Sequence, residues 1–129
     1  MPNSWDAGST AALASLGFEA IGTSSAALAF TLARPDTPGA LTVEEVLTNV
    51  RDIVASTSLP VSADFQSGYA DTPEQVHDRV KRCVEVGVAG LSIEMHQTVR
   101  VRASSGSKRR SIACAQLVQR CARSIPKLS

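Results

Sequence analysis

The strongest constraint on the fold is a regular alternation, over the first 94 residues, between short apolar runs and segments with helical periodicity. Apolar runs at 18–23, 59–63 and 89–93 are each followed by polar or turn residues, which is typical of buried parallel strands, and 1–4 is a shorter candidate. Such alternation indicates βαβ units and a parallel sheet, hence an α/β fold. The spacing alone fits both a doubly wound sheet and a (β/α) barrel.

Two helices have clear start signals. Thr42 and Glu45 have the spacing of a capping box, in which each side chain accepts a hydrogen bond from the other residue's backbone N–H. Thr72 precedes a proline at the first helical position, and this second helix is predicted to end near Gly87. The predicted apolar stripe of the first helix is Val43, Val46, Leu47, Val50, Ile53 and Val54, and the buried face of the second is Val76, Val80, Cys83 and Val84. A third helix is predicted over 7–16, packed through small residues, Leu13 and Leu16.

Polar side chains follow the predicted strands at the points where the strands end. These residues are Asn3, Ser24, Asp64 and Glu94. In parallel α/β folds the carboxyl ends of the strands form the edge where active sites are built. A carboxylate that ends an apolar strand is partly desolvated there, which favours a metal or substrate role for Asp64 and Glu94.

Charge divides the chain at Glu94. All 12 acidic residues lie at or before Glu94, whereas eight of the 13 basic residues follow it. We therefore predict one domain over 1–94 and a basic tail over 95–129 that is either disordered or contains one weak helix. One hypothesis for this change is a frameshift near codon 95, which a reading of the other two frames would test.

Two further features concern the compartment. No apolar run approaches the roughly 20 residues that a membrane-spanning helix needs, and the N-terminus does not resemble a secretory signal. The three cysteines, Cys83, Cys114 and Cys121, have no CxxC or metal-ligand spacing, so we expect reduced thiols. These features predict a cytoplasmic protein without a membrane partner.

Four sequence motifs, which occur in a fixed order along the chain, indicate a resemblance to a known protein family. They are Pro-Asn-Ser-Trp-Asp-Ala-Gly-Ser at 2–9, Gly-Thr-Ser-Ser-Ala at 22–26, Pro-Val-Ser-Ala-Asp at 60–64 with Gly-Tyr at 68–69, and Gly-Val-Ala-Gly-Leu-Ser-Ile-Glu at 87–94. Together they resemble the isocitrate lyase and phosphoenolpyruvate mutase superfamily, particularly its 2-methylisocitrate lyase-like and phosphonomutase-like members. The resemblance implies a partial (β/α)₈ TIM barrel of about three to four βα units, followed by a non-homologous basic tail. It also implies Mg²⁺-dependent cleavage of a C–C or P–C bond in a small 2-hydroxy or keto acid.

The resemblance assigns roles to individual residues. Ser24, Ser25 and Ala26 match the turn that holds the substrate carboxylate, and short hydroxyl side chains with exposed amides are suited to binding an anion. Without the resemblance, the two serines could equally cap the following turn.

The same comparison implies a set of Mg²⁺ ligands. Asp64 matches the direct metal ligand, Asp36 matches a loop carboxylate that reaches the metal through water, and Glu94 matches a supporting carboxylate. Oxygen donors with several water positions suit Mg²⁺. Taken alone, Asp36 could be a solvated loop acid.

Departures from the family pattern weaken this set. Gln66 replaces the second acid of the Asp-x-(Asp/Glu)-x-Gly-(Tyr/Phe)-Gly word, so it could act only through water, and Ala70 replaces the last glycine. The loop that carries the family's catalytic cysteine has no counterpart here, so no catalytic residue is predicted, and neither Cys114 nor Cys121 takes that role.

The chain has 129 residues, whereas a complete barrel needs about 250. We therefore expect this chain to be inactive by itself, with open sheet edges that favour a homo-oligomer or a complementing half-barrel. Two alternatives to a family enzyme are a non-catalytic fragment that binds a partner through those edges and, ranked last, a nucleic-acid binder that uses the basic tail.

Overall fold

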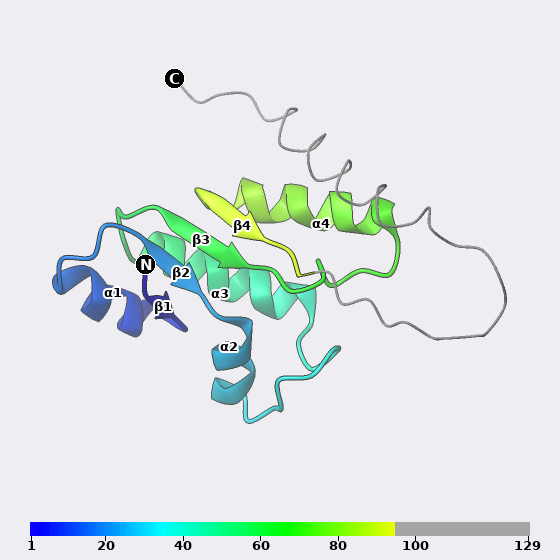
Figure 1. Ribbon diagram of the computed structural model, residues 1–129, viewed down its shortest axis with the longest axis horizontal. Helices are drawn as coiled ribbons and strands as arrows, with labels where there is room; N and C mark the ends of the chain where they lie inside the picture. The colour runs from blue at the N-terminus through cyan, green and yellow to red at the C-terminus, as the bar shows by residue number, and fades with distance from the viewer. Residues whose placement is uncertain (95–129) are drawn as a thin grey trace, which may run out of the picture.

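The computed structural model describes residues 1–94, which form one four-stranded parallel sheet with helices against it (Figure 1). Along the chain the elements are β1 (Asn3–Ser4), α1 (Ala7–Ser15), β2 (Ile21–Thr23), α2 (Ser25–Thr31), α3 (Val43–Ala55), β3 (Val61–Asp64), α4 (Pro73–Glu85) and β4 (Gly90–Ser92). The strands are ordered β1-β2-β3-β4, so each strand pairs with the strand that precedes it in the chain. The predicted α/β fold with a parallel sheet is confirmed.

The two faces of the sheet differ in chemistry. On the face toward the helices, Ile21, Val61 and Ala63 are almost fully buried and pack into the apolar core. Asn3, Gly22, Ser62 and Gly90 share one register row across the four strands, and this row is small and polar. The Asn3 side chain lies over Gly22, because a Cβ at that glycine would come within 2.6 Å of Asn3 Oδ1.

Among the described helices, α3 supplies the largest share of the buried core. Its predicted stripe is confirmed, with four members buried and the flanking valines packed partly against them. The buried members are Val46, Leu47, Val50 and Ile53. Phe65, just after β3, is the largest fully buried side chain. The prediction for Leu16 is wrong: it lies at the C-terminal cap of α1, where its side chain is 73% exposed.

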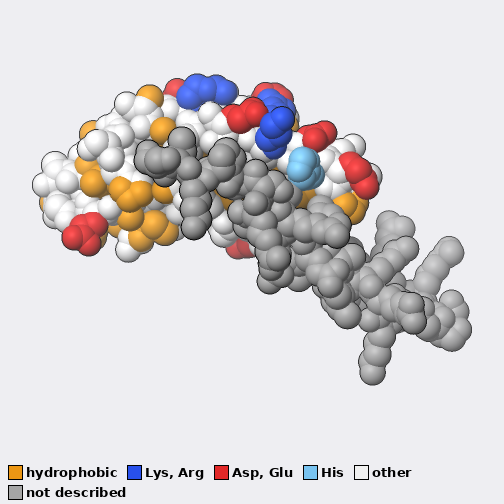
Figure 2. Space-filling view, turned by 90° about the horizontal axis from the view of Figure 1, so that it is seen from above, with side chains coloured by type: hydrophobic (Ala, Val, Ile, Leu, Met, Phe, Trp, Pro, Cys, Tyr) orange, Lys and Arg blue, Asp and Glu red, His pale blue; other side chains and the backbone are white. Residues whose placement is uncertain are grey.

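The helix caps follow the sequence signals. Thr42 and Glu45 form the predicted capping box of α3, and Thr72 caps α4 with proline at its start. Side chains then join the two helices, since the Arg82 guanidinium lies 2.6 Å from a Glu44 carboxylate oxygen. Figure 2 shows basic and acidic side chains interspersed over this surface. Exposed pairs of this kind contribute about 0–1 kcal/mol each, so the core stabilises the domain far more.

Helix α2 was not predicted, because its small residues directly follow a strand and resemble a turn. The Ser24 hydroxyl accepts a hydrogen bond from the Ala27 N–H at 3.3 Å and so caps the helix. Leu28 and Ala29 are buried in the core, whereas Phe30 is 64% exposed. Figure 1 shows α2 beside the end of β2, and its buried residues share one core cluster with those of α3.

Candidate metal and carboxylate site

The carboxylate of Asp64, the last residue of β3, is fixed by the first residue of α2, which follows the neighbouring strand β2. The Ser25 backbone N–H and hydroxyl both donate to Asp64 Oδ2, at 2.9 and 2.7 Å. The Asp64 N–H in turn donates to Thr23 Oγ1 at 2.9 Å. Since β2 and α2 meet at Thr23 to Ser25, the end of β2 orients the side chain that ends β3.

The other carboxylate oxygen of Asp64 is held more loosely. Among residues 1–94, Oδ1 accepts only a long contact of 3.4 Å from the Gln66 N–H. The Gln66 carbonyl accepts from the Glu94 N–H at 2.6 Å, which ties the ends of β3 and β4 together. Oδ1 is therefore the Asp64 oxygen better placed to meet an external ligand.

The loop after β3 adopts a sharply turned backbone. Gln66, Gly68 and Tyr69 have φ values of 39°, 77° and 54°, in the left-handed region that disfavours residues with a Cβ atom. The Gly68 N–H donates to the Phe65 carbonyl at 2.8 Å and closes the turn. Gly68 also packs closely, because a Cβ there would lie 3.2 Å from a methyl group of Val76. The family motif predicts a glycine at position 68, but it does not predict the positive φ of Gln66 and Tyr69.

Tyr69 brings a polar group into this region. Its ring packs edge-to-face on Phe65, with the centroids 5.3 Å apart. The hydroxyl oxygen is buried and has no hydrogen-bond partner among residues 1–94. Burial raises the pKa of the phenol, and the negative charges of Asp64 and Asp36 raise it further. The hydroxyl is thus electrostatically coupled to two of the predicted metal ligands.

The predicted metal ligands are positioned unequally. Asp64 is partly buried, whereas Asp36 and Glu94 are exposed. Within residues 1–94 no three His, Cys, Asp or Glu side chains lie close enough together to hold a metal ion. Mg²⁺ commonly binds through one or two carboxylates and retains several waters. The residues therefore fit an ion held directly by Asp64 and otherwise through water, but not a cage of three carboxylates.

The predicted substrate-binding serines already have partners within the chain. The Ser24 hydroxyl caps α2, and the Ser25 hydroxyl and N–H both bind Asp64. The Ala26 N–H has no acceptor among residues 1–94. Contact of these three residues with a substrate stays a prediction. Sequence reasoning found Ser25 and Asp64 separately but missed the hydrogen bonds between them, since the pairing depends on strand register.

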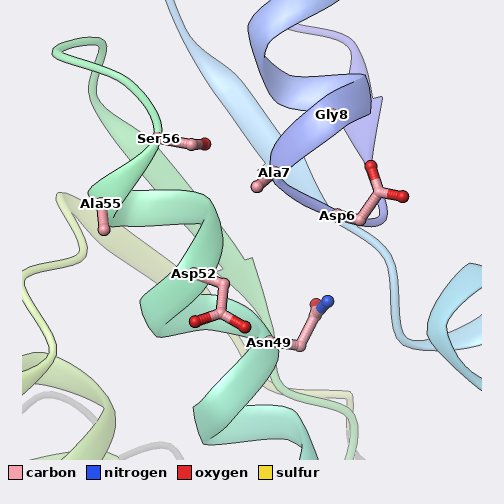
Figure 3. A pocket seen from close by; sticks show the side chains of 7 residues that line it. All are labelled: Asp6, Ala7, Gly8, Asn49, Asp52, Ala55 and Ser56. Atoms are coloured by element: carbon pink, nitrogen blue, oxygen red, sulfur yellow. The ribbon is translucent and has the colours of Figure 1, made fainter.

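A second concave feature lies on the helix side of the domain. An open hollow of about 500 Å³ lies between the first turn of α1 and the last turns of α3. Its polar side chains are Asp6, Asn49, Asp52 and Ser56, and Figure 3 shows the carboxylates of Asp6 and Asp52 pointing away from one another. The Asp6 carboxylate already caps α1 by accepting from the Ser9 N–H at 2.6 Å, and this bond lowers the pKa of Asp6. The hollow therefore offers no convergent ligand set.

Comparison with known proteins assigns the family. A family model described as phosphoenolpyruvate phosphomutase matches residues 1–124. The chain belongs to the phosphoenolpyruvate phosphomutase family. An uncharacterized protein of Mycobacterium tuberculosis is 32% identical over 94 residues, which are 73% of this chain and 34% of that relative.

Solved structures in this superfamily share the arrangement of strands and helices. A Burkholderia cenocepacia protein described as a lyase/mutase is 36% identical, with a TM-score of 0.84, over 98% of this chain and 44% of its own. A 2,3-dimethylmalate lyase is 27% identical, with a TM-score of 0.70, over 94% of this chain and 43% of its own. A phosphonopyruvate hydrolase solved with oxalate and Mg²⁺ is 22% identical, with a TM-score of 0.70, over 77% of this chain and 34% of its own. The predicted partial TIM barrel is confirmed.

The extent of these matches bears on the chain's organisation. The chain spans less than half the length of each of these relatives. The family match continues past Glu94 to residue 124, so the domain boundary at that residue stays a prediction. The predicted helix or disorder after the boundary lies outside the described residues, as does the basic cluster on which the predicted nucleic-acid alternative rests. No helix within residues 1–94 is long and apolar enough to cross a membrane.

Proposed function

We propose that this chain carries the Mg²⁺-binding part of a site for a small 2-hydroxy or keto acid. The single observation that carries the proposal is the Asp64 carboxylate, which ends β3 with one oxygen fixed by two donors of Ser25. A preoriented carboxylate at the C-terminal edge of a parallel sheet is suited to binding a hard cation. The relatives described as a lyase/mutase and as 2,3-dimethylmalate lyase support the reaction class, C–C or P–C bond cleavage.

The chemistry of that reaction class explains the need for positive charge. Cleavage of a C–C or P–C bond beside a carboxylate leaves an enolate, and a bound Mg²⁺ supplies charge that stabilises the developing oxyanion. Asp64 would hold the ion directly, with Asp36 and Glu94 acting through water. Gln66 is neutral where the family word has an acid, so we expect weaker metal binding than a carboxylate there would give. Residues 1–94 would bind the acid, and we propose that the chain by itself does not cleave it.

Calorimetry with oxalate, the ligand of the solved phosphonopyruvate hydrolase, tests the proposal. We expect oxalate to bind the full chain only when Mg²⁺ is present. Asp64→Asn should abolish binding, since a neutral amide is a poor Mg²⁺ ligand. Asp52→Asn is the matched control, because it removes the same charge from the hollow beside α1 and should leave binding unchanged. The proposal fails if the unsubstituted chain does not bind millimolar oxalate with Mg²⁺.

A second candidate function is partner binding through the sheet edges. In the described part of the chain β1 and β4 are the outermost strands, and Gly90 and Ser92 of β4 are exposed. An unpaired parallel edge can add another strand. The partner would be a second copy or a complementing half-barrel.

Sedimentation velocity over a range of concentrations tests this second function. A discrete dimer would support pairing with a second copy. A monomer that forms a stoichiometric complex with the separately expressed C-terminal half of the Burkholderia relative would support a complementing half-barrel. A monomer that binds neither would contradict edge pairing.

A further inference from the structure

The buried hydroxyl of Tyr69 is the polar group that the proposed function leaves without a role. Its oxygen is shielded from solvent, yet no acceptor or donor among residues 1–94 lies within hydrogen-bond distance. Most buried polar side-chain atoms in folded proteins have a partner, and leaving one without costs about 1–3 kcal/mol. An unpaired phenol in this position requires a physical explanation.

Packing alone does not supply that explanation. The ring contributes an edge-to-face contact with Phe65 and lies against the apolar core. A phenylalanine would make the same contact without burying a hydroxyl. The backbone at Tyr69 is also strained, with φ at 54°, a conformation that typically costs 1–3 kcal/mol for a residue with a side chain. Two features of Tyr69 are therefore unfavourable for stability: its strained backbone and its unpaired hydroxyl.

The surroundings of the hydroxyl indicate the kind of partner that it lacks. Burial raises the pKa of the phenol, and the charges of Asp64 and Asp36 raise it further, so the ionised form is disfavoured. The group therefore remains an O–H donor and is suited to an oxygen acceptor. Neither carboxylate is within reach of the hydroxyl as a direct acceptor. An acceptor oxygen on a molecule bound beside Asp64 would complete the arrangement.

We propose that Tyr69 is a ligand-binding residue whose hydroxyl donates a hydrogen bond to a carboxylate oxygen of the small acid bound at Asp64. This inference rests on the proposed function, because it needs an acid at that site. The hydroxyl would select for an oxygen acceptor at one end of the ligand, while Asp64 serves the metal. Burial around the phenol would strengthen the bond, since it excludes competing water.

Tyr69 is the chain's one tyrosine, so its hydrogen bonding can be observed directly. The intensity ratio of the tyrosine Fermi doublet in the Raman spectrum reports whether the phenol donates a hydrogen bond. We expect the ratio to change when oxalate is added with Mg²⁺, and not with Mg²⁺ alone. Tyr69→Phe should weaken oxalate binding about tenfold or more, as loss of a hydrogen bond to a charged group predicts. The thermal unfolding midpoint of the Tyr69→Phe variant should equal or exceed that of the unsubstituted chain, since the unpaired hydroxyl is removed.

The outcomes separate this inference from the proposed function. If oxalate with Mg²⁺ binds the unsubstituted chain but Tyr69→Phe binds it equally well, the role of Tyr69 is refuted and the site at Asp64 stands. A doublet that responds to Mg²⁺ alone would place the hydroxyl on a metal-bound water and refute the contact with the acid. If the unsubstituted chain binds no oxalate, both proposals are refuted. A lower unfolding midpoint without a change in affinity would make Tyr69 a structural residue.

Discussion

Replacing Ser25 with alanine tests whether the Asp64 carboxylate is held by the first residue of α2. The Ser25 side chain is 7% exposed, and its hydroxyl donates to Asp64 Oδ2 at 2.7 Å. A hydrogen bond to a charged group contributes about 1.5–3 kcal/mol net. Asp64 is only partly buried, and the Ser25 N–H still donates to the same oxygen in the variant, so we expect the lower end of that range.

A double-mutant cycle isolates this interaction from other effects of the substitution. The free energy of unfolding would be measured in urea for Ser25→Ala, Asp64→Ala and the double variant. We expect a coupling energy of about 1.5–2 kcal/mol between the two side chains. Ser24→Ala is the matched control: it removes a hydroxyl one residue away that caps α2. Loss of that cap should cost about 1 kcal/mol and couple to Asp64 by less than about 0.5 kcal/mol. A coupling energy for Ser25 no larger than that for Ser24 would refute the reasoning.

Further predictions concern the turn, the core and the cap of α3. Gly68→Ala should destabilise the domain by about 1 kcal/mol more than Gly39→Ala, as measured by urea unfolding. Both glycines have a positive φ, but only at Gly68 would the added Cβ lie against a neighbouring side chain. Equal losses of stability would contradict this prediction. Ile53→Ala should lower the free energy of unfolding by about 2–5 kcal/mol, because that side chain is fully buried, and a loss below 1 kcal/mol would contradict the assigned core. The hydrogen bond from Thr42 lowers the pKa of Glu45, so its stabilisation is present above the ordinary value of 4.5 and is lost as pH falls through the lowered pKa. Glu45→Gln should therefore show a flatter loss of stability in acid, and an unchanged pH profile would contradict the assignment.

The fold could be predicted because local patterns and global architecture agree. Helix α3 has a capping box followed by a regular apolar stripe, so its start and its buried face both follow from residue spacing. Helix α2 lacks these signals, since Ser24 caps a segment of small residues that has no apolar periodicity to distinguish it from a turn. Leu16 shows that an apolar residue can also mislead the prediction, because an apolar side chain at a helix end need not face the core.

The position of Asp64 at the edge of the sheet could be predicted, but the hydrogen bonds between the residues of the candidate site could not. Asp64 could be assigned to the edge of the sheet because it ends an apolar strand. Its hydrogen bonds to Ser25 depend on the register between β2 and β3, where Gly22 lies opposite Ser62, and short strands carry no clear signal of register. The positive φ of Tyr69 was equally hidden, because tyrosine is a residue type that seldom adopts it. Tertiary placement therefore decides which of the residues in a recognisable motif contact one another.

Localisation of a bound metal ion tests the central claim most directly. Mn²⁺ takes the same kind of oxygen ligands as Mg²⁺, and it broadens the NMR signals of nearby nuclei. Titration of the isotope-labelled chain with Mn²⁺ should broaden the backbone amide signals of Ser25, Asp64 and Gln66 first, and excess Mg²⁺ should restore them. Broadening that begins instead at Asp6 and Asp52, beside the hollow between α1 and α3, would contradict a metal site at the edge of the sheet.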